Sequence, residues 1–193
     1  RENTGFDAMA YKLAMTEYMG WEELERYDEI ILLNDTFYGP LYPWSEVFER
    51  MDVKPCDFWG LACHREGRDY YTKELDPSYI QSYFMVFRRN MFLDSAFQSY
   101  WNAFDSTHWI FSEVANKHEK TFTQAMERAG FSWDVYVHAE EYESDRPEEN
   151  FIQYHYISYQ MIRDHRYPVL KKKNFVRKRL VGNPGELGND TAK

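Results

Sequence analysis

Short apolar runs alternate with segments of helical periodicity along the chain, and this alternation constrains the fold more than any other feature. Residues 29–33, 57–63, 79–88 and 131–138 have the length and composition of strands. Apolar residues fall at helical spacing over 6–19, 44–51, 91–104, 107–129 and 151–166. Because strands that alternate with helices usually lie side by side in the same direction, we expect an α/β fold with a mostly parallel sheet.

The length of the chain, 193 residues, suits one domain, which we place at residues 1–170. Residues 67–78 and 140–150 are polar and predict loops. Beyond Pro168 we expect a short basic helix and a frayed end, together spanning residues 171–193, because residues 183–193 are rich in Gly and Asn.

Charge is distributed unevenly. Residues 171–193 contain seven Lys or Arg against Glu186 and Asp190, a net charge of +5. Because the whole chain has a net charge of −9, residues 1–170 carry −14. An acidic body argues against a nucleic-acid partner. The basic end is either a solvated helix face or a contact with an anionic membrane or a phosphorylated substrate.

Composition excludes several classes of protein. At 44% hydrophobic and 19% aromatic residues, the chain is too apolar for disorder. No apolar run is long enough to span a membrane. Cys56 and Cys63 have no zinc-site spacing and are predicted to be buried free thiols, which favours a reducing, cytoplasmic compartment.

The stretch YDEIILLNDTFYGPLYP, residues 27–43, places a carboxylate directly after a buried strand. Ligands of parallel α/β sheets bind outside the carboxyl ends of strands, where Asn34, Asp35 and Thr36 would lie. One alternative is a turn that Asp35 caps. The other is a metal-and-phosphate site, since Mg²⁺ needs few protein oxygens and shares the rest with phosphate and water.

Several stretches in a fixed order resemble the rhamnan synthesis F family of bacterial glycosyltransferase-like proteins. The resemblance covers residue 1 to about residue 175 and rests on the ordered set rather than on one motif. The stretches are RENTGFDAMAYK (1–12), YDEIILLNDTFYGPL (27–41), DFWGL (57–61), YIQSYFMVFRRN (79–90), HEKTFTQAMERAGF (118–131) and YPVLKKKNF (167–175).

The resemblance implies a GT-A-like, Rossmann-type sandwich that binds a nucleotide-sugar donor. It implies inverting transfer of a deoxyhexose, typically L-rhamnose from dTDP-rhamnose, to a lipid-linked glycan acceptor of cell-wall or O-antigen polysaccharide. The enzyme would work at the inner face of the cell membrane. Residue 1 falls after the strand–helix unit that usually opens such a domain, so we expect a partial domain. The acidic motif also has one carboxylate instead of two.

By the same resemblance, Asp35 would hold a divalent cation, Mg²⁺ or Mn²⁺, against the donor diphosphate. Glu119 would be the general base that takes the acceptor proton, with His118 beside it in the cleft. The alternative for Glu119 is an ion pair on a solvated helix face, for example with Lys120.

Other residues are candidates for substrate contacts. Gly5 lets backbone approach a ligand, whereas Asp7 is also a favourable first-turn residue. Gln81 and Ser82 interrupt an apolar strand and need polar partners. Trp59 either stacks on a pyranose ring or packs in the core. The full set of substrate-binding candidates is Asn3, Gly5, Asp7, Asn34, Thr36, Asp57, Trp59, Gln81, Ser82, His118 and Lys171.

A second function fits the same sequence. The aromatic content, the apparently missing first unit and the single carboxylate also suit a non-catalytic carbohydrate-binding or scaffolding module of a polysaccharide synthase. A phosphotransferase is disfavoured, because the chain has no Gly-rich phosphate loop with Lys and Ser or Thr.

Overall fold

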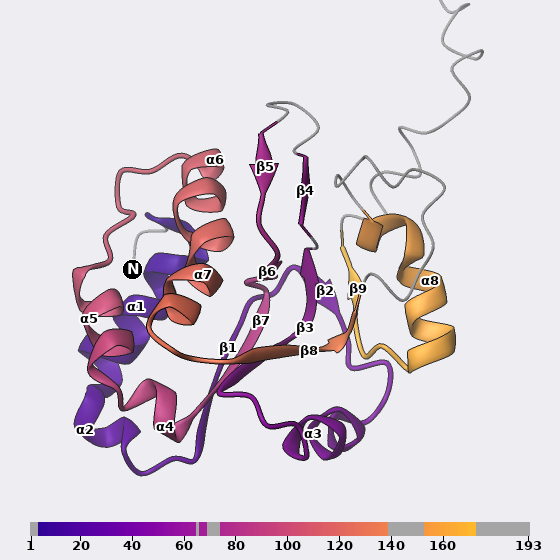
Figure 1. The fold of residues 1–193 in the computed structure, drawn as a ribbon, viewed down its shortest axis with the longest axis horizontal. Coiled ribbons are helices and arrows are strands. Elements are labelled where there is room, and N and C mark those ends of the chain that lie inside the picture. Colours follow the sequence, from indigo (N-terminus) through magenta and orange to yellow (C-terminus); the bar gives the residue numbers. More distant parts are fainter. Residues whose placement is uncertain (1–3, 65, 69–73, 139–152, 173–193) are drawn as a thin grey trace, which may run out of the picture.

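The computed structural model describes residues 4–64, 66–68, 74–138 and 153–172 (Figure 1). The helices are α1 (Phe6–Leu13), α2 (Trp21–Leu24), α3 (Trp44–Asp52), α4 (Arg89–Phe92), α5 (Ser95–Ala103), α6 (Phe111–Val114), α7 (Lys120–Arg128) and α8 (Gln153–His165), with π-helical turns η1 (Ala14–Met19) and η2 (Ala115–Glu119). The strands are β1 (Glu29–Leu33), β2 (Phe37–Tyr38), β3 (Phe58–His64), β4 (Gly67–Arg68), β5 (Leu75–Asp76), β6 (Tyr79–Ile80), β7 (Phe84–Arg88), β8 (Trp133–Val137) and β9 (Leu170–Lys171).

The main sheet is mixed and mostly antiparallel. β7 lies between β1 and β3 and runs antiparallel to both, and β6 also pairs antiparallel with β3. Among the described strands only β3 and β8 pair in parallel. Two small antiparallel pairs, β2–β9 and β4–β5, stand apart from this sheet.

The predicted mostly parallel, GT-A-like Rossmann sandwich is therefore wrong. A parallel neighbour needs a crossover of a dozen or more residues, usually a helix. Between β3 and β7 the described residues form only the β4–β5 pair and β6. The chain returns along β3 in the opposite direction, so β7 enters the sheet antiparallel. The fold is mixed α/β.

Helices cover both faces of the sheet (Figure 1). Side chains of β3 and β7 alternate between two cores, as a pleated strand requires. Phe58 and Phe87 enter the core beneath α1, α4, α5 and α7. Trp59 and Val86 enter the core beneath α3 and α8. β3 and β7 are thus buried on both sides, which explains why they are apolar at nearly every position, whereas Ile31 and Leu33 of β1 are exposed.

Several predicted elements have different limits in the structure. The helix predicted at 91–104 is two helices, because Asp94 caps α5 by accepting a 2.7 Å hydrogen bond from the backbone N of Ala96. The long helix predicted at 107–129 starts at Phe111 and contains the π-turn η2. The strand predicted at 79–88 is interrupted at residues 81–83.

The end of the described chain belongs to the fold. Leu170 and Lys171 form β9 and pair with Tyr38 and Phe37 of β2, so the predicted boundary at residue 171 falls inside a strand. The loop predicted at 140–150 and residues 173–193 of the predicted basic segment lie outside the described residues.

Candidate functional site

A group of polar side chains surrounds the point where β1 ends and β7 begins. Asn34 follows β1 directly, and its backbone N donates a 3.2 Å hydrogen bond to the carbonyl of Tyr83, the residue before β7. This bond extends the β1–β7 ladder by one position. It therefore fixes the turn after β1 against the Ser82–Tyr83 segment.

Asn34 connects that turn to the first helix. Its Oδ1 accepts hydrogen bonds from the backbone N of Thr36 at 3.1 Å and from Thr36 Oγ1 at 2.7 Å, an Asx-type turn. With the oxygen so occupied, Asn34 Nδ2 donates to Asp7 Oδ2 at 2.8 Å. A carboxylate on α1 and the turn after β1 are thereby held together.

The position of Asp7 is set by the unusual backbone conformation of the two residues before it. Gly5 has φ +73° and Phe6 has φ +57°, so the chain enters α1 through two left-handed residues. The buried Ser106 Oγ donates to the Gly5 carbonyl at 2.8 Å. A Cβ at Gly5 would lie 2.6 Å from Met9 Cβ and 2.8 Å from Ser106 Oγ. Only glycine fits this position without a shift.

Glu119 contacts the same region from the π-turn η2, which directly precedes α7. Its Oε1 accepts hydrogen bonds from the backbone N of Ser82 at 3.0 Å and from Ser82 Oγ at 2.9 Å. It lies at the last position of the π-turn η2, a kind of helical irregularity that often marks functional sites. The partner of Glu119 is thus Ser82, which lies in the interruption between β6 and β7. The predicted alternative partner, Lys120, pairs with Asp76 instead.

Tyr11 lies near both carboxylates. Its hydroxyl donates to the Ser82 carbonyl at 3.3 Å. Burial raises the pKa of Tyr11 well above its ordinary value, and the negative charges of Asp7 and Glu119 raise it further. Tyr11 therefore stays protonated and acts as a hydrogen-bond donor at any physiological pH.

Two lysines at the end of the described residues also contact this group. Lys171 Nζ donates to Thr36 Oγ1 at 2.7 Å and lies 3.7 Å from the centre of the Tyr83 ring. Lys172 Nζ is 3.3 Å from Asp35 Oδ2. The β2–β9 pairing makes these contacts, because it places residue 171 beside residue 37.

The residues after β1 do not assemble a cation site by themselves. The Asp35 side chain is 95% exposed and faces an ammonium group. The Asn34 oxygen already accepts two hydrogen bonds. Within the part of the chain that the structure describes, no three His, Cys, Asp or Glu side chains gather as metal ligands. The requirement for Mg²⁺ or Mn²⁺ stays a prediction.

Three other candidates lie elsewhere. Trp59 is fully buried and packs on Phe48 and Phe84, so no face of its ring is open to a sugar. Asp57 precedes β3, at the opposite end of that strand, and accepts hydrogen bonds from Ser132 N and Oγ. His118 points into an aromatic core formed with Trp101, Phe104 and Phe122.

His118 is a structural residue. Its Nδ1 is 2.7 Å from the Tyr100 hydroxyl, and burial lowers its pKa to about 3. The ring stays neutral at physiological pH and anchors the π-turn that carries Glu119. Gln81 is half-buried, with its backbone N bonded to the Ala62 carbonyl, and Asn3 lies outside the described residues.

The structure also adds residues that the sequence alone did not single out. Tyr11 follows Asp7 by four positions on one helix, a spacing that puts both on the same face and was visible in the sequence. Tyr83 follows Ser82, and its hydroxyl is hydrogen-bonded to that of Tyr167 in the core. Lys172 was predicted only as part of the run Lys171–Lys173, which the sequence suggested as a phosphate contact, and the structure adds its proximity to Asp35.

Fold and site together define a mixed α/β protein in which Asp7, Glu119, Lys171 and Lys172 are held around the end of β1 and the segment before β7. The chain belongs to the rhamnan synthesis protein F family, whose model matches residues 1–187. That match confirms the resemblance and assigns the chain to rhamnan synthesis, a branch of polysaccharide biosynthesis. No curated protein and no solved structure gives a significant match.

The described helices are short or polar in comparison with a helix that crosses a bilayer. None of them combines the length and the apolar composition that a membrane crossing requires.

Proposed function

We propose that the chain is a glycosyltransferase that moves a deoxyhexose from a nucleotide-sugar donor to a growing polysaccharide. The observation that carries the proposal is the Ser82–Tyr83 segment. Ser82 binds the Glu119 carboxylate, and the adjacent Tyr83 ring lies under the Lys171 ammonium. A candidate base and a candidate anion-binding group are thus held by consecutive residues. Family membership supports the same activity.

The reaction needs groups of both kinds. The acceptor hydroxyl oxygen forms a bond to the anomeric carbon while the bond from that carbon to the diphosphate oxygen breaks, and the electron pair leaves with the diphosphate. The acceptor proton passes to the Glu119 carboxylate. Lys171 and Lys172 stabilise the charge that develops on the leaving diphosphate. Attack opposite the leaving group inverts the anomeric centre through an oxocarbenium-like transition state.

The fixed hydrogen bonds prepare Glu119 for this role. Ser82 occupies Oε1 with two donors, and no other described residue donates a hydrogen bond to the Glu119 carboxylate. Oε2 is therefore the oxygen that receives the proton. Asp7, held by Asn34, is the second carboxylate of the site and can accept hydrogen bonds from sugar hydroxyls.

The donor that the family suggests is dTDP-L-rhamnose, and the acceptor is a lipid-linked glycan at the cytoplasmic face of the membrane. The basic residues that follow Lys172 in the sequence would contact anionic lipid there. Asp35→Ala, titrated with dTDP-rhamnose with and without Mg²⁺ or Mn²⁺, tests the metal prediction. Metal-dependent binding that disappears in this variant would support it, and metal-independent binding would remove it.

Glu119→Gln tests the activity. The amide keeps an oxygen for the Ser82 donors but cannot take the proton, so transfer should fall by about 10²-fold or more while dTDP-rhamnose affinity is retained. Glu113→Gln is the matched control, because Glu113 is paired with Lys117 on the same helical run and lies outside the site. Transfer at the parent rate by Glu119→Gln would refute the base. Glycan binding without nucleotide binding in the parent would instead support the scaffolding module.

A further inference from the structure

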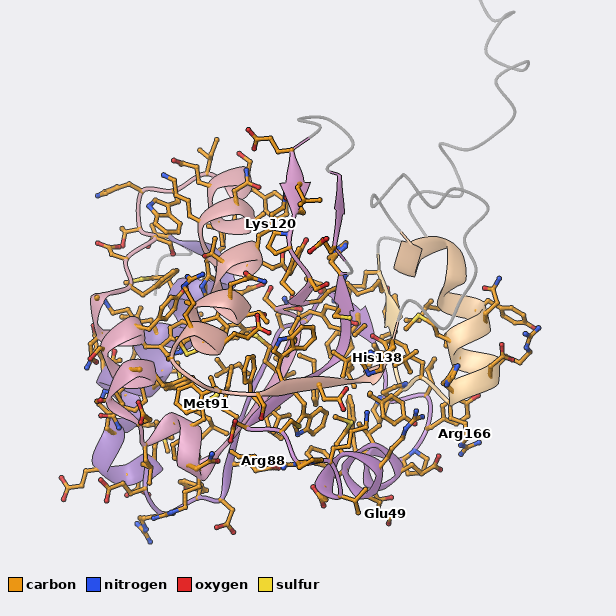
Figure 2. All side chains as sticks on the ribbon, viewed as in Figure 1. Glu49, Arg88, Met91, Lys120, His138 and Arg166 are labelled. Atoms are coloured by element: carbon orange, nitrogen blue, oxygen red, sulfur yellow. The ribbon has the colours of Figure 1, made fainter. Side chains whose placement is uncertain are left out.

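A depression lined mostly by polar residues lies at Lys120, the residue after Glu119, and takes no part in the proposed transfer step. It lies between α7 and the β4–β5 pair and has a volume of about 390 Å³. Figure 2 shows Lys120 on the side of α7 that faces these strands. The lining includes Asp76, Asn116, Lys120, Thr121, Gln124 and Arg128.

The depression has a fixed wall. Lys120 Nζ and Asp76 Oδ2 are 2.8 Å apart, and their side chains are only 18% and 17% exposed. Gln124 Nε2 donates to the Ser78 carbonyl, and Thr123 Oγ1 accepts a 3.1 Å hydrogen bond from Ile80 N. Helix and strands are thus joined at three successive levels. The shape is built into the fold and does not depend on loose side chains.

One group in this wall lacks a partner. Gln124 Oε1 is buried, and no described residue donates a hydrogen bond to it. A buried acceptor without a donor costs about 1–3 kcal/mol, so an unpaired one calls for an explanation. Because Oε1 has almost no accessible surface, a ligand hydroxyl group would reach it only if the end of the Gln124 side chain, which lines the depression, turned outward.

The formal charges of the described lining residues disfavour a strongly ionic ligand. Glu74 and Asp76 balance Lys120 and Arg128, so the formal charges cancel. Asn116 and Thr121 add neutral donors and acceptors on the exposed rim. Many hydrogen-bonding groups without net charge match a hydroxyl-rich neutral molecule. A phosphate or a nucleotide would need an excess of cations.

We propose that this depression binds sugar units of the acceptor glycan, an inference that rests on the proposed transferase function. Lys120 directly follows Glu119, and their partners Asp76 and Ser82 lie on the same stretch of chain. A saccharide in the depression therefore leads toward the Glu119 carboxylate. The donor diphosphate takes the lysine side of the site and the acceptor chain takes the α7 side.

Thr121→Trp tests the site without removing any of its walls. Thr121 is exposed, so the indole fills the depression and leaves the Lys120–Asp76 pair intact. Arg128→Ala removes a rim donor instead of adding bulk. Glu49→Trp is the matched control, because it also puts an indole on an exposed helical position. Glu49 lies on α3, far from Lys120 (Figure 2).

The probe is a rhamnose oligosaccharide, titrated by calorimetry with dTDP at saturation, and dTDP is titrated separately. Thr121→Trp should weaken oligosaccharide binding by about tenfold or more, whereas its affinity for dTDP and its melting temperature match those of the parent. Arg128→Ala should weaken oligosaccharide binding less than Thr121→Trp does. Glu49→Trp should leave the affinities for both the oligosaccharide and dTDP unchanged.

Parent-like oligosaccharide affinity in both Thr121→Trp and Arg128→Ala would overturn the proposed saccharide site. If dTDP binding were retained in that case, the proposed transferase function would not be contradicted. A parent chain that binds dTDP but no oligosaccharide would also overturn it. Oligosaccharide binding that depends on Thr121, without any dTDP binding, would keep the saccharide site and refute the transferase.

Discussion

Replacement of Gly5 by alanine should destabilise the protein by about 3 kcal/mol or more. An alanine at φ +73° costs about 1–2 kcal/mol in the left-handed region. The new methyl group would also lie 2.6 Å from Met9 Cβ and 2.8 Å from the buried Ser106 Oγ, and such overpacking costs about 1–3 kcal/mol. Relief of the clash requires the Ser106–Gly5 hydrogen bond to lengthen, which displaces the start of α1 and with it Asp7.

Thermal unfolding followed by circular dichroism measures this effect. For a chain of this size, about 3 kcal/mol corresponds to a melting temperature lower by roughly 10 °C. Gly130→Ala is the control, because Gly130 also has a positive φ, +98°, but no neighbouring atom lies within 4 Å of the point that a Cβ would occupy. It should lose about 1–2 kcal/mol from backbone conformation alone. Equal losses in the two variants would refute the crowding around Gly5.

Two further predictions concern charge. His118 has a folded pKa of about 3 against an ordinary value of 6.5, so the unfolded chain takes up the proton first and stability is lost as the pH falls below 6.5. Between pH 7 and pH 5 this group should lower the free energy of unfolding of the parent by about 2 kcal/mol. Denaturant titrations of His118→Phe should lack this loss. The same dependence of unfolding free energy on pH in the parent and the variant would contradict the prediction. Lys171→Met keeps an apolar stem over Tyr83 but removes the ammonium, so calorimetry should show dTDP-rhamnose affinity reduced by about tenfold or more. Unchanged affinity would remove Lys171 from the diphosphate site.

The sequence was sufficient for local structure where one signal dominated. Residues 29–33 were predicted as a strand and form β1 with the same limits, because an uninterrupted apolar run of this length has few alternatives. The position of α3 after Pro43 was predicted equally well, since proline favours the first turn. The family resemblance also held over nearly the whole chain.

Strand direction could not be obtained from the alternation alone. The expected parallel sheet assumed a crossover between every pair of strands, yet residues 67–78 had no helical pattern. The absence of a crossover helix there indicates an antiparallel return, which β7 makes. Helical periodicity also did not reveal η2, because a single π-turn shifts the phase of the apolar face by only one residue.

The candidate site was partly visible in the sequence. Asp7, Asn34, Ser82, Glu119 and Lys171 were chosen from five separate stretches, and the structure brings them into one hydrogen-bonded neighbourhood, although their roles stay predictions. The buried positions of Trp59 and His118 could not be distinguished from exposed ones, since an aromatic or histidine side chain is compatible with either.

The pairing of β2 with β9 has a consequence for the order in which the protein matures. Lys171 binds Thr36 across 135 positions of the chain. During synthesis, Asp7 and the turn after β1 leave the ribosome long before Lys171 and Lys172, which contact Thr36 and Asp35 of that turn. The nascent protein therefore carries an acidic half-site until residue 171 has emerged, and a proteolytic cut just before β9 would return the mature protein to that state.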